Sequence, residues 1–283
     1  MTKKFILNAD DFGMSQAFNK AVLKGYQNGI LTSASICANG EAFEQAVREI
    51  IPQCPDLSIG VHLNIIEGKS LTKVPMLTDE NGIFNNGYGA MILKSYNKEF
   101  LRQVEQEFKA QIEAIIIKTH VDHIDSHVHT HAIPNIFKIV VKLAKEYKIP
   151  YVRTQFEHPY LIPSIKKHLT TAYPINLIKI MLLNTFTMIN SGLIKEKHLK
   201  TNDYLIGVGY TGMMDDRSIA YGLKSLQNKD CIAEALIHPC DYDNETKDHH
   251  TTEFELTQNE DLRDYIKQLG FELTNHTKGM KNE

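Results

Sequence analysis

The sequence His123-Ile-Asp-Ser-His-Val-His-Thr-His131 holds four of the chain's thirteen histidines within nine residues. The polar residues of this stretch that stand two apart are His123, Asp125, His127, His129 and His131. In a β-strand that period places every one of them on the same face. Ile124 and Val128 alternate with them, so the other face is expected to be buried, although a surface strand with solvated histidines would alternate in the same way. A row of imidazoles above a buried face favours a metal-binding or catalytic site in a cleft or barrel interior.

Length and composition narrow the classes of protein. A chain of 283 residues can bury a large core in one α/β barrel, and a net charge of −3 gives no basic surface for nucleic acid. The four cysteines are scattered without a CxxC pair, which indicates reduced, buried thiols and a cytoplasmic protein. The N-terminus meets acidic residues after a short apolar run, so no signal peptide is expected. The most apolar segment, residues 173–193, contains Pro174, Lys179 and three asparagines, so no membrane span is expected.

The chain alternates between apolar strand patterns and amphipathic helix patterns. Strands are predicted over residues 4–8, 31–38, 57–64, 123–131, 151–154 and 231–240, and residues 202–212 suggest another strand and a Gly-rich loop. Helices are predicted over residues 15–29, 41–51, 98–118, 134–148, 218–228 and 261–269. Glu107 and Gln111 are expected on a partly exposed helix face, and residues 65–95 form a long loop beside the strand ends. About seven β-α units without a linker predict one parallel α/β domain with right-handed crossovers.

Polar residues recur at the ends of five of these strands: Asp10 and Asp11, His62, Asp125 and His127, Arg153, and His238. Two adjacent aspartates could instead form a turn or cap a helix, and a lone histidine in an apolar strand is often a core residue. A doubly wound sheet also fits the alternation, but convergence from many strands is easier in a closed barrel. Arg153 needs a partner if it is buried.

An acid and two histidines from three strands can hold a hydrolytic metal ion with one position open for water. Zn²⁺, Mg²⁺ and Mn²⁺ all accept such oxygen and nitrogen ligands. A second carboxylate can then take a proton from water, and an opposite histidine can protonate the leaving group. Asp10, beside Asp11, and His238, on the last strand, offer these two groups.

Four blocks together resemble the YdjC/ChbG-like carbohydrate deacetylases. The blocks are Asn8-Ala-Asp-Asp-Phe-Gly13, Gly60-Val-His-Leu63, His123-Ile-Asp-Ser-His-Val-His129 and Leu236-Ile-His-Pro239. Members of that family are bacterial enzymes that remove acetyl groups from the N-acetylglucosamine units of chitooligosaccharides. The resemblance extends from residue 4 to about residue 243 and keeps the order of the blocks.

The resemblance implies a single distorted TIM-like (β/α) barrel of about seven parallel strands. Residues 1–283 would form one carbohydrate deacetylase domain with a helical insertion around 156–200. It also implies one divalent metal ion per chain, Mg²⁺ by resemblance and Zn²⁺ as the alternative, held by Asp11, His62 and His127. Asp10 would be the general base and His238 the general acid.

The remaining polar residues have supporting roles in this interpretation. His123 and Asp125 lie deeper in the barrel and would orient the ligands. If the strand is shorter than the two-residue period suggests, His129 and His131 lie beyond its end, where they face substrate or solvent. Arg153 falls where the family often has an arginine, which would orient an acid or the substrate. The expected reaction is amide hydrolysis of an acetylated amino-sugar oligosaccharide such as diacetylchitobiose, with release of acetate.

The chain departs from the family pattern in two places, and two other functions would use similar residues. Cys240 follows His238-Pro239 where the family often has glycine, and the 156–200 insertion is rich in lysine, asparagine and isoleucine. Both leave the preferred length of substrate open. A metal-dependent phosphoesterase would use a similar cluster, usually with several metals, and a non-catalytic sugar- or metal-binding relative would keep the fold. The spare carboxylate of Asp10 argues against mere binding, and the apolar segment 173–193 makes a homodimer possible.

Overall fold

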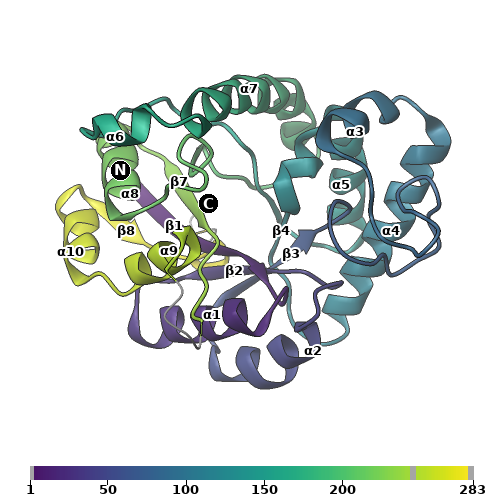
Figure 1. Ribbon diagram of the computed structural model, residues 1–283, viewed down its shortest axis with the longest axis horizontal. Helices are drawn as coiled ribbons and strands as arrows, with labels where there is room; N and C mark the ends of the chain where they lie inside the picture. The colour runs from purple at the N-terminus through teal and green to yellow at the C-terminus, as the bar shows by residue number, and fades with distance from the viewer. Residues whose placement is uncertain (1–2, 243–246, 280–283) are drawn as a thin grey trace.

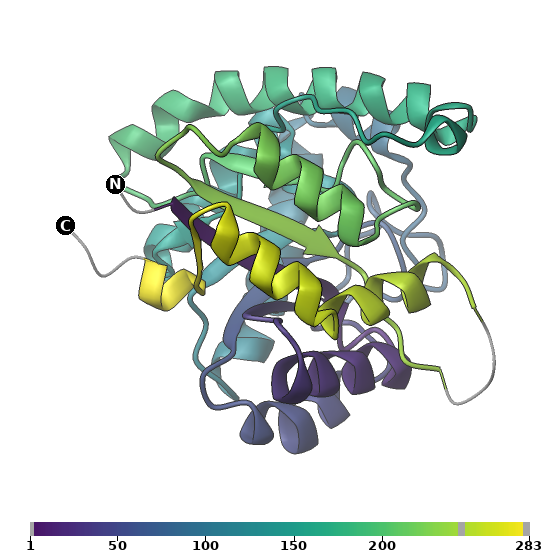
Figure 2. The ribbon, with the colours of Figure 1, turned by 90° about the vertical axis from the view of Figure 1, so that its left-hand side faces the viewer.

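The computed structural model describes residues 3–242 and 247–279, which form an α/β barrel surrounded by helices (Figures 1 and 2). The strands are β1 (Lys3–Phe12), β2 (Ser33–Ile36), β3 (Ser58–Leu63), β4 (His123–Ser126), β5 (Tyr151–Val152), β6 (Tyr204–Ile206), β7 (Ile232–Ile237) and β8 (Phe271–Leu273). The longer helices are α1 (Gln16–Asn28), α3 (Tyr88–Lys94), α4 (Lys98–Ile116), α5 (Pro134–Glu146), α7 (Ala172–Glu196), α8 (Asp216–Ser225), α9 (His249–Thr257) and α10 (Glu260–Gln268). The short helical pieces are α2 (Phe43–Gln45), η1 (Ala46–Ile50), η2 (Ile51–Gln53), η3 (His127–Ala132), α6 (Ile165–His168) and α11 (His276–Gly279).

Seven parallel strands curl into the predicted barrel in the order β5-β4-β3-β2-β1-β7-β6. The curl leaves the two end strands, β5 and β6, without a ladder between them. Neighbouring segments bridge the gap, because Val152 N–H donates to Lys200 O at 3.0 Å and Leu205 N–H donates to Phe156 O at 2.8 Å. The barrel is therefore closed irregularly on this side. The short strand β8, which was not predicted, pairs with the start of β1.

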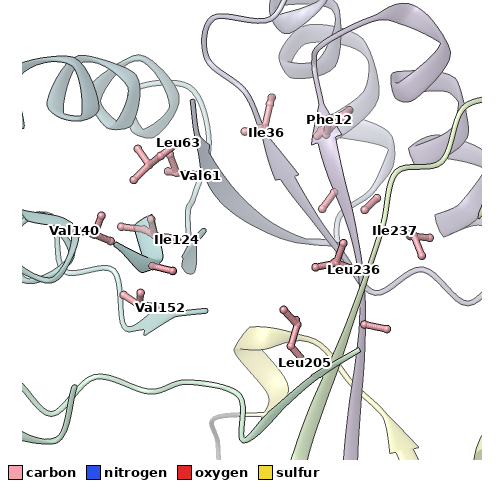
Figure 3. Close-up of a cluster of buried hydrophobic side chains, with 14 of the residues drawn as sticks. Phe12, Ile36, Val61, Leu63, Ile124, Val140, Val152, Leu205, Leu236 and Ile237 are labelled. Carbon is pink, nitrogen blue, oxygen red and sulfur yellow. The ribbon is translucent and has the colours of Figure 1, made fainter. Parts of the chain in front are cut away.

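The strands bury apolar residues against the helices and turn polar residues inward. Val61 and Leu63 of β3, Ile124 of β4 and Val152 of β5 belong to one apolar cluster with Val140 of α5 (Figure 3). The alternate residues of the same strands meet inside the barrel and form hydrogen bonds or ion pairs there. They include Asn8, Asp10, Ser35, His62, His123, Asp125, Arg153 and Glu234. A polar interior supplies fixed partners for charged groups that solvent does not reach.

The prediction of a strand over residues 123–131 is wrong in its second half. β4 ends at Ser126, and the chain turns into η3, where Val128 and His129 have φ values of 52° and 57°. Left-handed backbone is rare for a β-branched residue. Only His123 and Asp125 therefore follow the two-residue period, and the later histidines are placed by the turn.

Other differences concern helices. Residues 41–51 form α2, η1 and the beginning of η2 rather than one regular helix, and α9 was not predicted. Glu107 and Gln111 were expected to be partly exposed, yet both are fully buried. Glu107 accepts from the N–H groups of Leu71 and Thr72, and Gln111 binds both backbone groups of Asn64. These two α4 side chains fix the start of the long loop after β3, which explains their burial.

The segment 156–200 contains α6 and α7, and α7 runs across one side of the barrel (Figures 1 and 2). By length and composition alone, α7 is long and apolar enough to cross a membrane, with a mean hydropathy of 1.5. A third of its most apolar stretch is buried among the described residues. Its asparagines face the protein: Asn184 donates to Glu157 O at 3.0 Å and Asn190 to Ala132 O at 2.8 Å. Ile178 and Met181 are exposed instead. The homodimer expected from this segment stays a prediction.

Candidate active site

Asp11, His62 and His127 come together at the carboxyl ends of the strands. Asp11 lies within a shift in the register of β1 between Ala9 and Phe12 and has a φ of 63°. Its Oδ1 lies 3.3 Å from His62 Nε2 on β3 and 2.8 Å from His127 Nδ1 directly after β4. One oxygen thus lies between two imidazoles from other strands. An oxygen and two nitrogens form a donor set that divalent cations accept, so these residues fit the metal site expected from the sequence.

The electrostatics of this cluster favour a bound cation. Burial opposes charge on His62, but the carboxylates of Asp125 and Asp10 outweigh it and raise the pKa of His62 to about 10. Burial also opposes charge on His127, but Asp11 raises its pKa above the ordinary value. Carboxylates therefore favour positive charge at the position where the sequence predicts a metal ion. Asp125 Oδ1 lies 2.7 Å from His62 Nδ1, which leaves Nε2 directed at Asp11. A carboxylate behind a ligating histidine fixes its orientation and tautomer.

Asp10 is held in place by an arginine. Arg153 is fully buried, and its NH1 and NH2 groups each donate to one oxygen of Asp10 at 2.8 Å. Asn8 Nδ2 donates to Asp10 Oδ1 at 2.7 Å. Arg153 also contacts Asp125 at 2.7 Å and Glu234 of β7 at 2.6 Å. Three buried carboxylates around one guanidinium give it the partners that a buried charge needs, and the planar fork fixes the direction of Asp10.

His238 follows the end of β7 and is paired with an acid from α9. Its Nδ1 lies 3.4 Å from Oε2 of Glu253, which is fully buried and also accepts from the His238 backbone N–H. His250 Nδ1 lies 2.7 Å from the His238 carbonyl oxygen. Burial lowers the pKa of His238, but its hydrogen bond to Glu253 and the charge of that residue raise the pKa to about 9. His238 is therefore protonated at neutral pH and can donate a proton.

A cleft of about 330 Å³ brings the candidate catalytic residues to one surface. Asp10, His127, His129 and His238 all line it. Its other walls are formed mainly by apolar or aromatic side chains together with one lysine: Tyr88, Val128, Lys179, Leu182, Leu183, Val208 and Leu236. A cleft with a few convergent polar groups on an apolar wall is typical of a small-molecule site.

The histidines that follow β4 divide into two roles. His129 lines the cleft, and its buried Nδ1 has no hydrogen-bond partner in the described chain. Burial and the charge of Arg153 hold the pKa of His129 well below its ordinary value, so its ring is neutral and can bind a polar group of a ligand. His131, which was expected to face substrate or solvent, is fully buried instead. It lies 2.5 Å from Ser126 Oγ and 3.0 Å from Arg153 O, so it supports the turn.

His123 lies at the floor of the barrel, away from the proposed ligands. Its Nδ1 is 2.6 Å from Asp122 Oδ1, its Nε2 is 3.0 Å from Ser35 Oγ, and its ring stacks on His276 with centroids 3.7 Å apart. Only glycine fits opposite this ring, since a Cβ on Gly60 would lie 2.1 Å from His123 Nε2. Hydrogen bonds link His123 to the site through Ser35, which donates to Asp125.

Four residues of this region were not singled out from the sequence as site residues. Glu253 and Glu234 hold His238 and Arg153, as described above. Glu67, in the loop after β3, lies 3.4 Å from His127 Nε2. Cys37 follows β2, and burial and the carboxylates of Asp11 and Asp125 hold the pKa of its thiol well above its ordinary value. Such a thiol is a poor nucleophile. The two-residue period Ser33-Ser35-Cys37 was the available signal for Cys37, because it places this residue inside the barrel.

Comparison with known proteins identifies the family. The model of the YdjC-like protein family matches residues 4–268. A carbohydrate deacetylase of Geobacillus stearothermophilus is 33% identical over 69% of this chain and 78% of its own length. One of Brevibacillus brevis is 38% identical over 52% of this chain and 58% of its own. A crystal structure from Enterococcus faecalis, described as a candidate cellobiose-phosphate cleavage protein, shares the fold with a TM-score of 0.74 and 23% identity, covering 98% of this chain and 99% of that one. The chain belongs to the YdjC-like family.

Proposed function

We propose that this protein is a metal-dependent carbohydrate deacetylase. It hydrolyses the N-acetyl group of N-acetylglucosamine-containing oligosaccharides, such as diacetylchitobiose, and releases acetate. The observation that carries the proposal is that Asp10 and His238 line the same cleft as His127, beside the Asp11–His62–His127 cluster. The relatives named carbohydrate deacetylases support the same activity.

Asp10 is suited to accept a proton from water. Arg153 and Asn8 hold its carboxylate, and the residue lines the cleft. The geometry that Arg153 imposes directs a lone pair toward a fixed position, which is what a general base requires. A divalent ion held by Asp11, His62 and His127 would supply Lewis acidity, which acidifies water and stabilises negative charge on the acetyl oxygen.

His238 is suited to protonate the departing amine. Its pKa of about 9 keeps the proton available at neutral pH, and Glu253 keeps the ring oriented. A C–O bond forms at the acetyl carbon and the C–N bond breaks, so the products are acetate and a free amino sugar. The apolar cleft wall formed by Leu182, Leu183 and Val208 offers a dry surface for the acetyl methyl group and a sugar face.

The first test separates the base from the metal ligands. Asp10→Asn should abolish acetate release from diacetylchitobiose and retain the metal, because Asp10 is not proposed as a ligand. His127→Ala should lose the metal. Asp264→Asn and His120→Ala change the same residue types at exposed positions and should leave both properties intact. An active Asp10→Asn protein would refute the base assignment, and full metal occupancy in His127→Ala would refute the ligand assignment.

The number and identity of the metal ions are also part of the proposal. We propose one ion per chain, Mg²⁺ by resemblance to the family or Zn²⁺ as the alternative. Elemental analysis of the purified protein measures the number of metal ions per chain and identifies the element. More than one ion per chain, together with release of phosphate from sugar phosphates, would favour a phosphoesterase instead.

A further inference from the structure

Cys37 lies against the proposed metal site from a strand that supplies none of its expected ligands. It directly follows β2 and is fully buried. Its backbone position is fixed, since its N–H donates to Phe12 O at 2.8 Å and its carbonyl accepts from Gly40 N–H at 3.2 Å. Its side chain is therefore held between the end of β1 and the turn after β2.

The thiol sulfur forms a compact group with two of the expected ligands. One ligand atom each from Asp11, Cys37 and His62 lies within 4.8 Å of the other two, and all three residues are buried. Atoms at such separations can contact a common ion at ordinary metal–ligand distances of about 2.0–2.3 Å after small side-chain adjustments. Among the described residues, His127 belongs to no group this compact, although its Nδ1 lies 2.8 Å from Asp11.

General burial of thiols does not account for this placement. Cys54, Cys231 and Cys240 are also free and buried, but none of them belongs to a compact group of potential ligands in the described chain. A structural cysteine usually behaves as a small apolar residue in apolar surroundings. Cys37 instead lies beside the carboxylate of Asp11 and the imidazole of His62, so its surroundings are polar. This is an environment that suits a metal ligand.

We propose that Cys37 Sγ is a ligand of the metal ion, beside Asp11 and His62, and that it makes the site selective for Zn²⁺ over Mg²⁺. The inference rests on the metal-dependent function proposed above. Thiolate sulfur favours zinc and disfavours magnesium, which prefers oxygen ligands. On binding, the thiol proton passes to solvent and a sulfur–metal bond forms, with no change of oxidation state.

The direct test uses the unaltered protein. X-ray absorption of the zinc-loaded wild type should show one sulfur scatterer at about 2.3 Å in addition to nitrogen and oxygen at about 2.0–2.2 Å. The cobalt-loaded wild type should show a sulfur-to-cobalt charge-transfer band in the near ultraviolet. A bound ion with only nitrogen and oxygen neighbours overturns the Cys37 inference and leaves the deacetylase proposal standing. A wild type that binds no divalent ion overturns both.

Variants then test selectivity. Cys37→Ser should lose the charge-transfer band and weaken Zn²⁺ binding by at least about tenfold, the lower end of the effect of losing an outer-shell partner. Mg²⁺ affinity should not fall. Cys54→Ser, at the opposite end of β3, is the matched control and should keep the band. Cys37→Ala serves where the serine variant does not fold. A band that persists in either folded Cys37 variant, or an unchanged preference for Zn²⁺, refutes the proposal.

Discussion

Replacing Glu253 with glutamine should move the pH dependence of deacetylation without destroying the site. Glu253 Oε2 lies 3.4 Å from His238 Nδ1 and accepts from the His238 backbone N–H. A glutamine oxygen can accept the same backbone bond, so the variant removes mainly the charge. Burial lowers the pKa of His238, and the interaction with Glu253 is the largest influence that raises it to about 9. Without this charge, the pKa should fall to about 6.5, the ordinary value for histidine, or below.

The magnitude follows from the protonated fraction of His238. A general acid works only in its protonated form, so wild-type activity should be lost as the pH rises through about 9 and variant activity as it rises through about 6.5. At about pH 8, roughly 90% of wild-type His238 is protonated but only about 3% in the variant, which predicts about thirtyfold lower kcat/KM. At about pH 5.5 the two proteins should differ by less than about twofold.

The assay is acetate release from diacetylchitobiose across this pH range, with metal content measured at each pH. Glu255→Gln, at an exposed position of the same helix α9, is the control and should retain the wild-type profile. A Glu253→Gln protein whose activity declines at the same alkaline pH as the wild type contradicts the assignment of His238 as the proton donor. A loss of equal size at every pH contradicts it as well.

Three further outcomes test the network around the site. Arg153→Met leaves three buried carboxylates without their counter-charge and should lower the free energy of unfolding by about 3–5 kcal/mol in urea titrations; an unchanged midpoint would contradict the network. Gly60→Ala places a Cβ 2.1 Å from His123 Nε2 and should cost about 1–3 kcal/mol by calorimetry, whereas a neutral result would mean that the imidazole is free to move. Zn²⁺ at about one hundred times its Kd should stabilise the wild type by about 2.7 kcal/mol, and an equal gain in His127→Ala would exclude this residue as a ligand.

The barrel and its candidate site could be predicted because two features of the sequence indicated the same fold. Apolar strands alternated with amphipathic helices, and acids or histidines stood at the ends of several strands. Parallel strands bring such ends to one side of the sheet. For this reason Asp11, His62 and His127 meet in the structure although they are far apart in the chain.

The parts that escaped prediction depend on contacts that a local pattern does not contain. The left-handed turn at Val128 and His129 carries no glycine to mark it, so a strand seemed to continue through the later histidines. Glu107 looked like a surface residue on an amphipathic helix, but it is buried by the backbone of a distant loop. Glu253 contacts His238 because α9 lies against the end of β7 in the fold. No spacing in the sequence predicts that contact.

The place of β1 in the sheet has a consequence for how the protein is made. This strand leaves the ribosome before the other strands of the barrel, yet it pairs with β7 and β8, which are synthesised after the other strands. About 220 residues separate the end of β1 from the start of β7, or about 10–45 s at ordinary rates of synthesis. Throughout that interval one edge of β1 is open to pairing with other nascent chains. We therefore expect the barrel to close only after β7 has left the ribosome, and the nascent chain to need protection by chaperones until then.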